Sequence, residues 1–439
     1  MTTGHRAAGG RTGARFRPRW RATVQPRAAL ETGLIVAAFA ALFFLLPRDL
    51  RGDDITRLRD ITVLLGRGQL TSSRFSLVEG LISAPVLLLG HLTQSRAWWA
   101  AHFNTIALAA GVAAAWGLLH RRMDARLFRL SVLVLLCASF MTSRLRDYNG
   151  ETVTAVLVTL GILCLATRRH VLAGWGAIVL GVVNNPAALA GLILLAGLHT
   201  VRTRQLRHLL PVAAAAALIA AEAWIRRGGP LVTGYQGQPY DTPFLLGLGS
   251  ILFSSGRGLL FFTPGLVLWF SPRVRRGLPG RTAVALMLAF LAGLILIYSA
   301  WWAWYGGLSW GPRFFEFAAL PAAILIAAGI GQAGRSAAAD LLTLAALTLS
   351  AWVAFAGATV DLTTALQYCR AHWASQACLY RPQDSGLWQP AAHFPHLTGA
   401  TLALSILIGV VYLYLGAPLA ASLGRAARPR RSWTASWRI

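Results

Sequence analysis

Long apolar stretches alternate with short polar segments along most of this 439-residue chain. A helix needs roughly 20 apolar residues to cross a bilayer, and uninterrupted runs near that length indicate membrane spans rather than amphipathic soluble helices. The pattern predicts an all-α polytopic membrane protein with about twelve transmembrane helices. The predicted helices cover the runs 29–47, 98–120, 127–143, 152–167, 171–184, 186–200, 209–225, 259–271, 282–299, 317–333, 341–358 and 398–417.

Two places leave the helix number open. Asn184, Asn185 and Pro186 interrupt an apolar region that is either one broken helix or two helices in a tight hairpin. The stretch 77–90 (LVEGLISAPVLLLG) is either a further span or a helix lying at the membrane surface. Because counting 77–90 as a span would place the RRMDAR segment on the outer side, we expect a helix there that lies at the membrane surface or is partly re-entrant.

The charges are sorted along the chain. The formal net charge is +26, and all 41 basic residues are arginine. With the N-terminus in the cytoplasm and a hairpin at 184–186, 26 arginines fall on cytoplasmic segments and eleven of the 15 acidic residues fall on outer segments. This asymmetry is typical of membrane orientation, so the positive charge gives no reason to expect a nucleic-acid partner.

This topology predicts three parts. Two basic, disordered cytoplasmic tails (1–28 and 418–439) flank a transmembrane domain (29–417) whose largest outer loops are 48–97 and 359–397. No small-residue cleavage site follows the first apolar run, so we expect that run to be an uncleaved helix.

Cysteine and histidine offer little chemistry. Cys369 and Cys378 share the last outer loop, where an oxidising compartment would allow a disulfide, although free thiols stay an alternative. Histidines are scattered and form no close cluster with cysteine, so we expect no structural metal site. A divalent cation held loosely by acidic side chains stays open.

Acidic residues on the outer side are the first candidates for catalysis. Asp53 and Asp54 precede a segment with apolar residues at helical spacing, so they either act as a general base or merely cap an interfacial helix. The polar stretch SRLRDYNGE (143–151) places Asp147 and Glu151 on the same side of the membrane. An ordinary turn with an internal ion pair is the alternative there.

Two further stretches carry isolated arginines. Arg257 lies between glycines before an apolar run, where a guanidinium can bind phosphate or simply reach lipid headgroups. The stretch WWAWYGGLSWGPRFFEF (301–317) is compatible with an interfacial aromatic belt, which does not account for its glycines, Arg313 or Glu316. Arg313 and Glu316 are three residues apart, so we expect them to share a helix face and pair.

Together these segments resemble the GT-C superfamily of membrane glycosyltransferases, which includes relatives of protein mannosyltransferases and bacterial aminoarabinose or arabinofuranosyl transferases. Four stretches carry the likeness in order: GDD with its following helix, SSRFSLVEGLISAPVLLLG, GRGLLFFTPGLVL and WWAWYGGLSWGPRFFEFAALP. The resemblance covers most of 29–335. The Asp-Asp pair departs from the more common Asp-Glu pair, which leaves open which carboxylate reacts.

The resemblance implies an enzyme of the cell membrane with its active site on the extracytoplasmic face. A polyprenyl-phosphate-linked sugar is the expected donor, and a glycan, lipid or protein hydroxyl is the acceptor, with inversion at the sugar carbon. The implied roles are Asp54 or Asp53 as base, Asp147 or Glu151 as second acidic position, and Arg313, Arg257 and Arg74 on the donor phosphate. Trp304, Tyr305, Trp310 and Glu316 are the expected sugar or lipid contacts.

Two other functions fit the same composition. A transporter or flippase for a lipid or saccharide usually carries charges or broken helices at mid-membrane, and Glu222 with Asn184–Asn185 are the hints of that kind. A non-catalytic envelope-assembly protein would be favoured by a degenerate acidic pair, whereas the pair here is intact.

Overall fold

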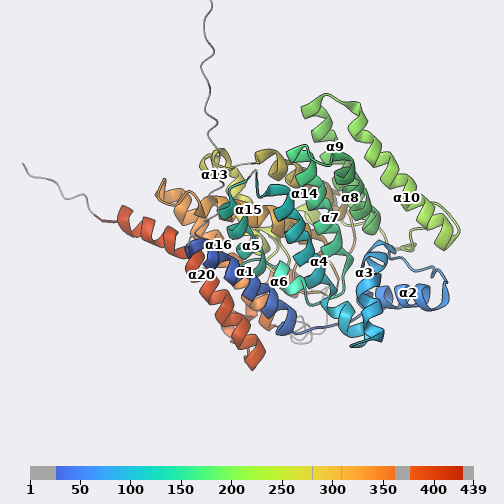
Figure 1. Ribbon diagram of the computed structural model, residues 1–439, viewed down its shortest axis with the longest axis horizontal. Helices are drawn as coiled ribbons and strands as arrows, with labels where there is room; N and C mark the ends of the chain where they lie inside the picture. Colours follow the sequence, from blue (N-terminus) through green and yellow to red (C-terminus); the bar gives the residue numbers. More distant parts are fainter. Residues whose placement is uncertain (1–25, 122, 279, 308, 361–375, 429–439) are drawn as a thin grey trace, which may run out of the picture.

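The computed structural model describes residues 26–121, 123–278, 280–307, 309–360 and 376–428, and in these ranges the regular structure is helical (Figure 1). Nine helices of the described part are long and apolar enough to cross a membrane. They are α1 (Pro26–Phe44), α4 (Arg96–Leu119), α7 (Gly150–Thr167), α9 (Leu189–Thr203), α10 (Leu210–Arg227), α14 (Arg281–Ser299), α15 (Ala319–Ile330), α16 (Ala337–Thr359) and α20 (Gly399–Ala426). Three of these spans, α9, α10 and α15, include the 3-10 helix that precedes each: η2 (Pro186–Ala188), η3 (Leu206–Leu209) and η5 (Arg313–Ala318). The all-α, multi-pass membrane architecture is therefore confirmed.

Shorter helices complete the described chain. The longer ones are α2 (Asp53–Arg67), α3 (Val78–Leu88), α5 (Ala125–Cys137), α8 (Val171–Asn184) and α11 (Phe244–Phe253). The remainder are η1 (Leu89–His91), α6 (Met141–Arg144), α12 (Leu259–Phe262), η4 (Pro264–Phe270), α13 (Pro272–Arg276), α18 (Gln376–Tyr380), η6 (Pro382–Asp384) and α19 (Gln389–Ala392).

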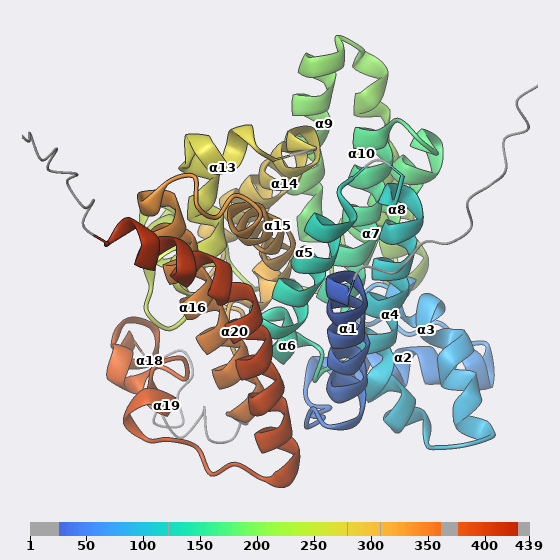
Figure 2. The ribbon, with the colours of Figure 1, turned by 60° about the vertical axis from the view of Figure 1, so that its left-hand side comes forward.

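The short elements gather at opposite ends of the bundle. In Figure 2, α2, α3, α6, α18 and α19 lie at the lower end, whereas α13 lies at the upper end. The connectivity agrees, because α14 leads from the α13 side to the loop that carries residues 300–312. The lower end is the one that the sequence predicts to be extracytoplasmic.

The hairpin expected at Asn184–Pro186 is present. Asn185 is extended and Pro186 opens η2, so α8 ends at Asn184. Trp175 near the start of α8 lies with its ring 5.8 Å from that of His199 near the end of α9, which shows that the two helices run in opposite directions.

Several predicted elements differ from the observed ones. The run 259–271 is broken at Thr263, which is forced from the helical region before Pro264, so it forms α12 and η4 instead of one span. The run 127–143 ends as a helix at Cys137. Residues 244–253, predicted to be loop, form α11, and α20 continues through Pro418 into the predicted C-terminal tail. The predicted tail segments 1–25 and 429–439 lie outside the described residues.

Close packing of α11 on the end of α14 provides a test of the fold. A Cβ at Gly247 would lie 1.8 Å from the Ser299 carbonyl oxygen, whereas a Cβ at Gly249 in the same helix would meet nothing within 4 Å. We expect Gly247→Ala to lower the free energy of unfolding by about 1–3 kcal/mol because a backbone atom cannot yield as a side chain would. Gly249→Ala is the matched control, and thermal unfolding in detergent measures both; equal melting temperatures would contradict this packing.

Candidate active-site pocket

A pocket of about 380 Å³ opens at the lower end of the bundle, where α2, α6 and the loops after α10 and α14 meet. Its wall carries four aspartates and five arginines among tryptophan, tyrosine and glycine. These charged residues are Asp49, Asp53, Asp54, Asp147, Arg51, Arg74, Arg144, Arg146 and Arg313. Charges of both signs in one concavity suit a site that binds an anion and moves a proton.

Asp53 and Asp54 occupy the first turn of α2, an amphipathic helix that begins after Gly52. Gly52 is the N-cap, has φ 55°, and offers no side-chain cap bond. The expectation that the two acids cap the helix is therefore wrong, because they already belong to its first turn. Consecutive residues of a helix point about 100° apart, so the neighbouring carboxylates enter different surroundings.

Asp53 is held by two arginines. Arg313 approaches it at 2.6 Å and Arg74 at 2.9 Å, each through a guanidinium nitrogen and a different carboxylate oxygen. Burial opposes ionisation, but Arg313 and Arg74 outweigh it and hold the pKa of Asp53 below its ordinary value. Asp53 is therefore an ionised anchor for two cationic groups, and a poor proton acceptor.

Asp54 has the opposite environment. Its carboxylate forms no ion pair or hydrogen bond with another described residue, and burial together with the nearby Asp147 carboxylate raises its pKa to about 9. The pKa of Asp147 is also raised, chiefly by burial, although Arg144 contacts it at 2.8 Å. Two adjacent acids with pKa values displaced in opposite directions are the arrangement expected of separate catalytic roles.

Arg313 and Glu316 do not pair, contrary to the prediction. Phe315 departs from helical geometry inside η5, so the i,i+3 relation of a regular helix is lost. Arg313 instead contacts Asp53 and lies 3.8 Å from Glu151. Glu316 is buried, accepts a hydrogen bond from Thr152 and lies 3.5 Å from the Arg144 Nε.

The glycines of the 301–317 stretch have a conformational role. Gly306, Gly307 and Gly311 all have positive φ, at 85°, 66° and 74°, where residues with a Cβ are disfavoured. A Cβ on Gly306 would also approach the Arg313 side chain to 3.1 Å. These glycines let the loop fold back over the pocket and place Arg313 opposite Asp53.

Four candidate contacts and the acidic candidate Glu151 lie outside the pocket wall; the contacts are Arg257, Trp304, Tyr305 and Glu316. Arg257 is buried and donates to the Gly311 carbonyl at 2.7 Å, and burial lowers its pKa to about 10. Trp304 and Tyr305 belong to the same loop and are buried, whereas Trp310 does line the pocket. Arg257 thus supports the loop that carries Arg313.

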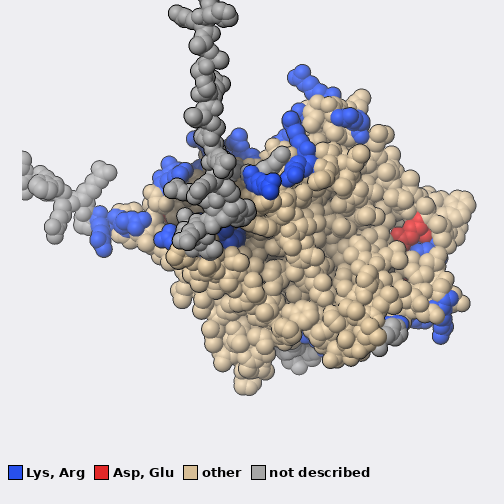
Figure 3. Space-filling view, viewed as in Figure 1, with Lys and Arg blue, Asp and Glu red and all other residues tan. Residues whose placement is uncertain are grey.

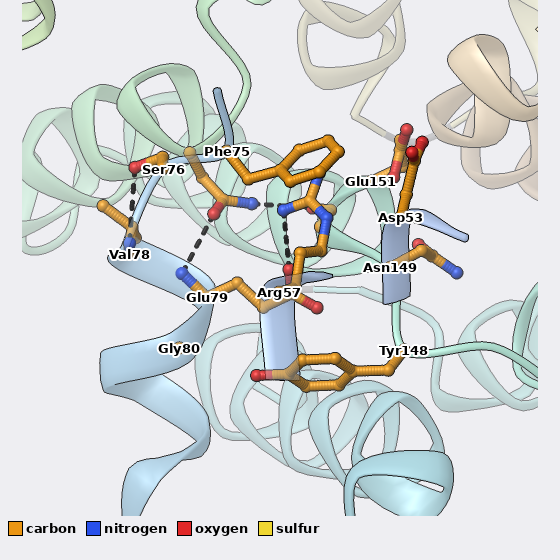
Figure 4. Close-up of polar contacts among 12 residues, drawn as sticks. Asp53, Arg57, Phe75, Ser76, Val78, Glu79, Gly80, Tyr148, Asn149 and Glu151 are labelled. Atoms are coloured by element: carbon orange, nitrogen blue, oxygen red, sulfur yellow. Dashed lines mark hydrogen bonds and ion pairs between the residues drawn. The ribbon is translucent and has the colours of Figure 1, made fainter. Parts of the chain in front are cut away.

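A buried cluster of polar side chains joins α2 and α3 behind the pocket. Figure 4 shows Arg57 between the Phe75 ring and the Glu79 carboxylate, which it contacts at 2.8 Å. The Asn184 side chain accepts from the Glu79 backbone and donates to the Gly150 carbonyl, which joins α3 to the start of α7 and the end of α8. Burial raises the pKa of Glu79 to about 7.

Sequence reasoning missed part of the wall. Arg144 lies in the stretch singled out for its acids, and its Nε is buried without a hydrogen-bond partner. Tyr235 and Gln238 enter from the loop after α10, and the Arg74 guanidinium lies 5.1 Å from the Tyr235 ring centroid. The one charge of this loop, Asp241, does not line the pocket, so only the fold reveals the role of the loop.

The remaining predictions concern cysteine and metals. Cys137 and Cys164 are free and buried, and Cys378 is disulfide-bonded. Cys369, its expected partner, lies outside the described residues. In the part of the chain that the structure describes, no group of three or more His, Cys, Asp or Glu side chains is placed to hold a metal ion.

Comparison with known proteins shows the fold. No family model matches this sequence, and no curated protein matches it. Two crystal structures of ArnT from Cupriavidus metallidurans match at 15% identity over 91% of this chain and 78% of theirs. The TM-score is 0.53 for ArnT bound to undecaprenyl phosphate and 0.51 for the apo state. The described chain is therefore similar to ArnT in fold.

Proposed function

We propose that this chain is a glycosyltransferase of the cell membrane that moves a sugar from a polyprenyl phosphate to an acceptor hydroxyl, with inversion, on the extracytoplasmic face. One observation carries the proposal. The same pocket holds a carboxylate with a raised pKa, Asp54, and a carboxylate bound by two arginines, Asp53. The likeness to a protein crystallised with undecaprenyl phosphate supports the choice of donor.

The phosphate of the donor belongs beside Arg313 and Arg74. Both guanidinium groups converge on Asp53, and the Arg313 Nε is buried without a hydrogen-bond partner. As the bond to the sugar breaks, negative charge develops on the departing phosphate, and positioned arginines stabilise it. Arg144 lies in the same wall and is a third arginine that can donate hydrogen bonds to the phosphate.

Proton removal from the acceptor falls to Asp54. The acceptor oxygen attacks the anomeric carbon opposite the leaving phosphate, and its proton passes to the Asp54 carboxylate, so a single displacement inverts the configuration. The Asp54 and Asp147 carboxylates are both buried and lie near one another, so ionising both at the same time is unfavourable. That repulsion makes the ionised Asp54 a strong proton acceptor.

The features that suggested a transporter have structural roles. Glu222 accepts hydrogen bonds from Ser76 and from the Leu77 backbone, just before α3, and pairs with Arg226 at 2.6 Å. Asn184 belongs to the buried polar cluster behind the pocket. Both therefore brace the first outer loop, which weakens the case for transport.

The test is a transfer assay with the full-length protein in liposomes and polyprenyl phosphates charged with radiolabelled hexoses or pentoses. We expect release of polyprenyl phosphate with at least one donor, and its loss in the Asp53→Ala, Asp54→Ala double variant. If both single variants and the double variant fold and transfer at the parental rate, the catalytic assignment is wrong. Movement of intact labelled donor across the bilayer without release would instead indicate a flippase.

A further inference from the structure

A second concavity lies at the opposite end of the bundle from Asp53. It measures about 780 Å³ and is formed by the end of η4, by α13, by the turn after α15 and by the first turn of α16. Since α14 starts just after α13 and ends at the pocket loop, roughly 28 Å of helix separate the two sites. The concavity is therefore independent of the proposed active site.

Three arginines converge on this concavity. Arg273 and Arg276 come from α13, and Arg335 comes from the turn between α15 and α16. None of the three forms an ion pair with a described residue. The nearest acid in the sequence, Asp340, is buried and accepts hydrogen bonds from the Gly334 backbone and Ser422, so it does not neutralise them.

The concavity is built rather than incidental. Gln332 lies against Gly277, where a Cβ would approach its amide nitrogen to 2.4 Å, and it donates to the Ala328 carbonyl at 3.2 Å. Phe270 and Leu342, which are 78% and 39% exposed, form an apolar wall on the side of the spanning helices. A basic floor beside an exposed apolar wall matches a phosphate headgroup with its acyl chains.

We propose that this concavity binds an anionic phospholipid of the leaflet opposite the proposed active site. The arginine side chains hold the phosphate, and the acyl chains lie along Phe270 and Leu342. Figure 3 shows arginines gathered along the edge of the molecule that carries α13 and the end of α9. The basic tails of the chain itself are unsuitable occupants because they carry the same charge.

Native mass spectrometry of the full-length protein in detergent tests the proposal, with phosphatidylglycerol as the titrant. We expect the Arg273→Gln, Arg276→Gln, Arg335→Gln triple variant to bind one phosphatidylglycerol molecule at least about tenfold more weakly than the parent. The matched control replaces Arg202, Arg204 and Arg207 with glutamine, which removes the same charge at the same end but outside the concavity. The control and the parent should retain the lipid equally.

Four outcomes would overturn the proposal. An equal loss in the control variant would mean that net charge alone attracts the lipid. Equal retention of phosphatidylcholine by the parent would remove the role of the anionic headgroup. Binding of glycerol 3-phosphate as tight as that of the lipid would indicate a soluble anion site, and displacement of the lipid by a soluble acidic peptide would indicate a protein partner.

Discussion

Asp54→Asn is expected to slow sugar transfer by about 10²–10⁴-fold while donor binding persists, because the variant keeps the shape of the side chain but cannot accept a proton. The buried carboxylate has a pKa raised to about 9, so its ionised form is unfavourable in the folded protein near neutral pH. The substitution should therefore leave the melting temperature unchanged or raised, which separates lost chemistry from lost folding. Single-turnover transfer and donor binding are the measurements, with the exposed Asp241→Asn as control.

The pH dependence of kcat/KM tests the role of Asp54 as general base. A general base acts when ionised, so kcat/KM should rise with pH and level off near the Asp54 pKa of about 9. Asp147 is the largest charged contribution that raises this pKa, and Asp147→Asn should therefore move the rising limb to lower pH. A flat profile between about pH 6 and 9, or an unmoved limb in Asp147→Asn, would remove Asp54 from the role of base.

The broad architecture follows from sequence because bilayer length and positive-inside asymmetry act locally along the chain. The hairpin at Asn184–Pro186 is predictable for that reason, since only that turn sorts the arginines. Pro264 also signals the helix break at Thr263–Pro264, but the run 259–271 is so apolar that it was predicted to be one span. Helix α11 was missed because its ten residues fall below the span length used to recognise helices.

The pocket was harder to predict because its charges meet only in three dimensions. Asp53 and Arg313 are 260 residues apart, yet they form an ion pair at 2.6 Å. Sequence spacing suggested an Arg313–Glu316 pair, and the irregular η5 separated them. The different environments of Asp53 and Asp54 also depend on distant partners, Arg313 of η5 for Asp53 and Asp147 after α6 for Asp54, so identical neighbours in sequence gave no sign of which one reacts.

Arg313→Gln is expected to weaken donor binding and to lower transfer by about 10²–10³-fold, because one phosphate contact and the stabilisation of the leaving group are lost together. Two explanations predict this loss. Either Arg313 binds the donor phosphate directly, or it only holds Asp53, which it contacts at 2.6 Å. Normal donor binding by Arg313→Ala would exclude the first and return the 301–317 stretch to a purely structural role.

The two explanations separate in a double-mutant cycle with Asp53→Asn. If Arg313 only orients Asp53, both single variants and the double variant should lose the same activity, since each breaks one shared contact. If Arg313 binds phosphate, Asp53→Asn leaves the guanidinium in place and relieves its competition with the donor, so donor affinity should hold or increase. Donor binding in Asp53→Asn is then the deciding measurement, and we expect the second result because the Arg313 Nε, 3.8 Å from Glu151, still has no hydrogen-bond partner for its proton.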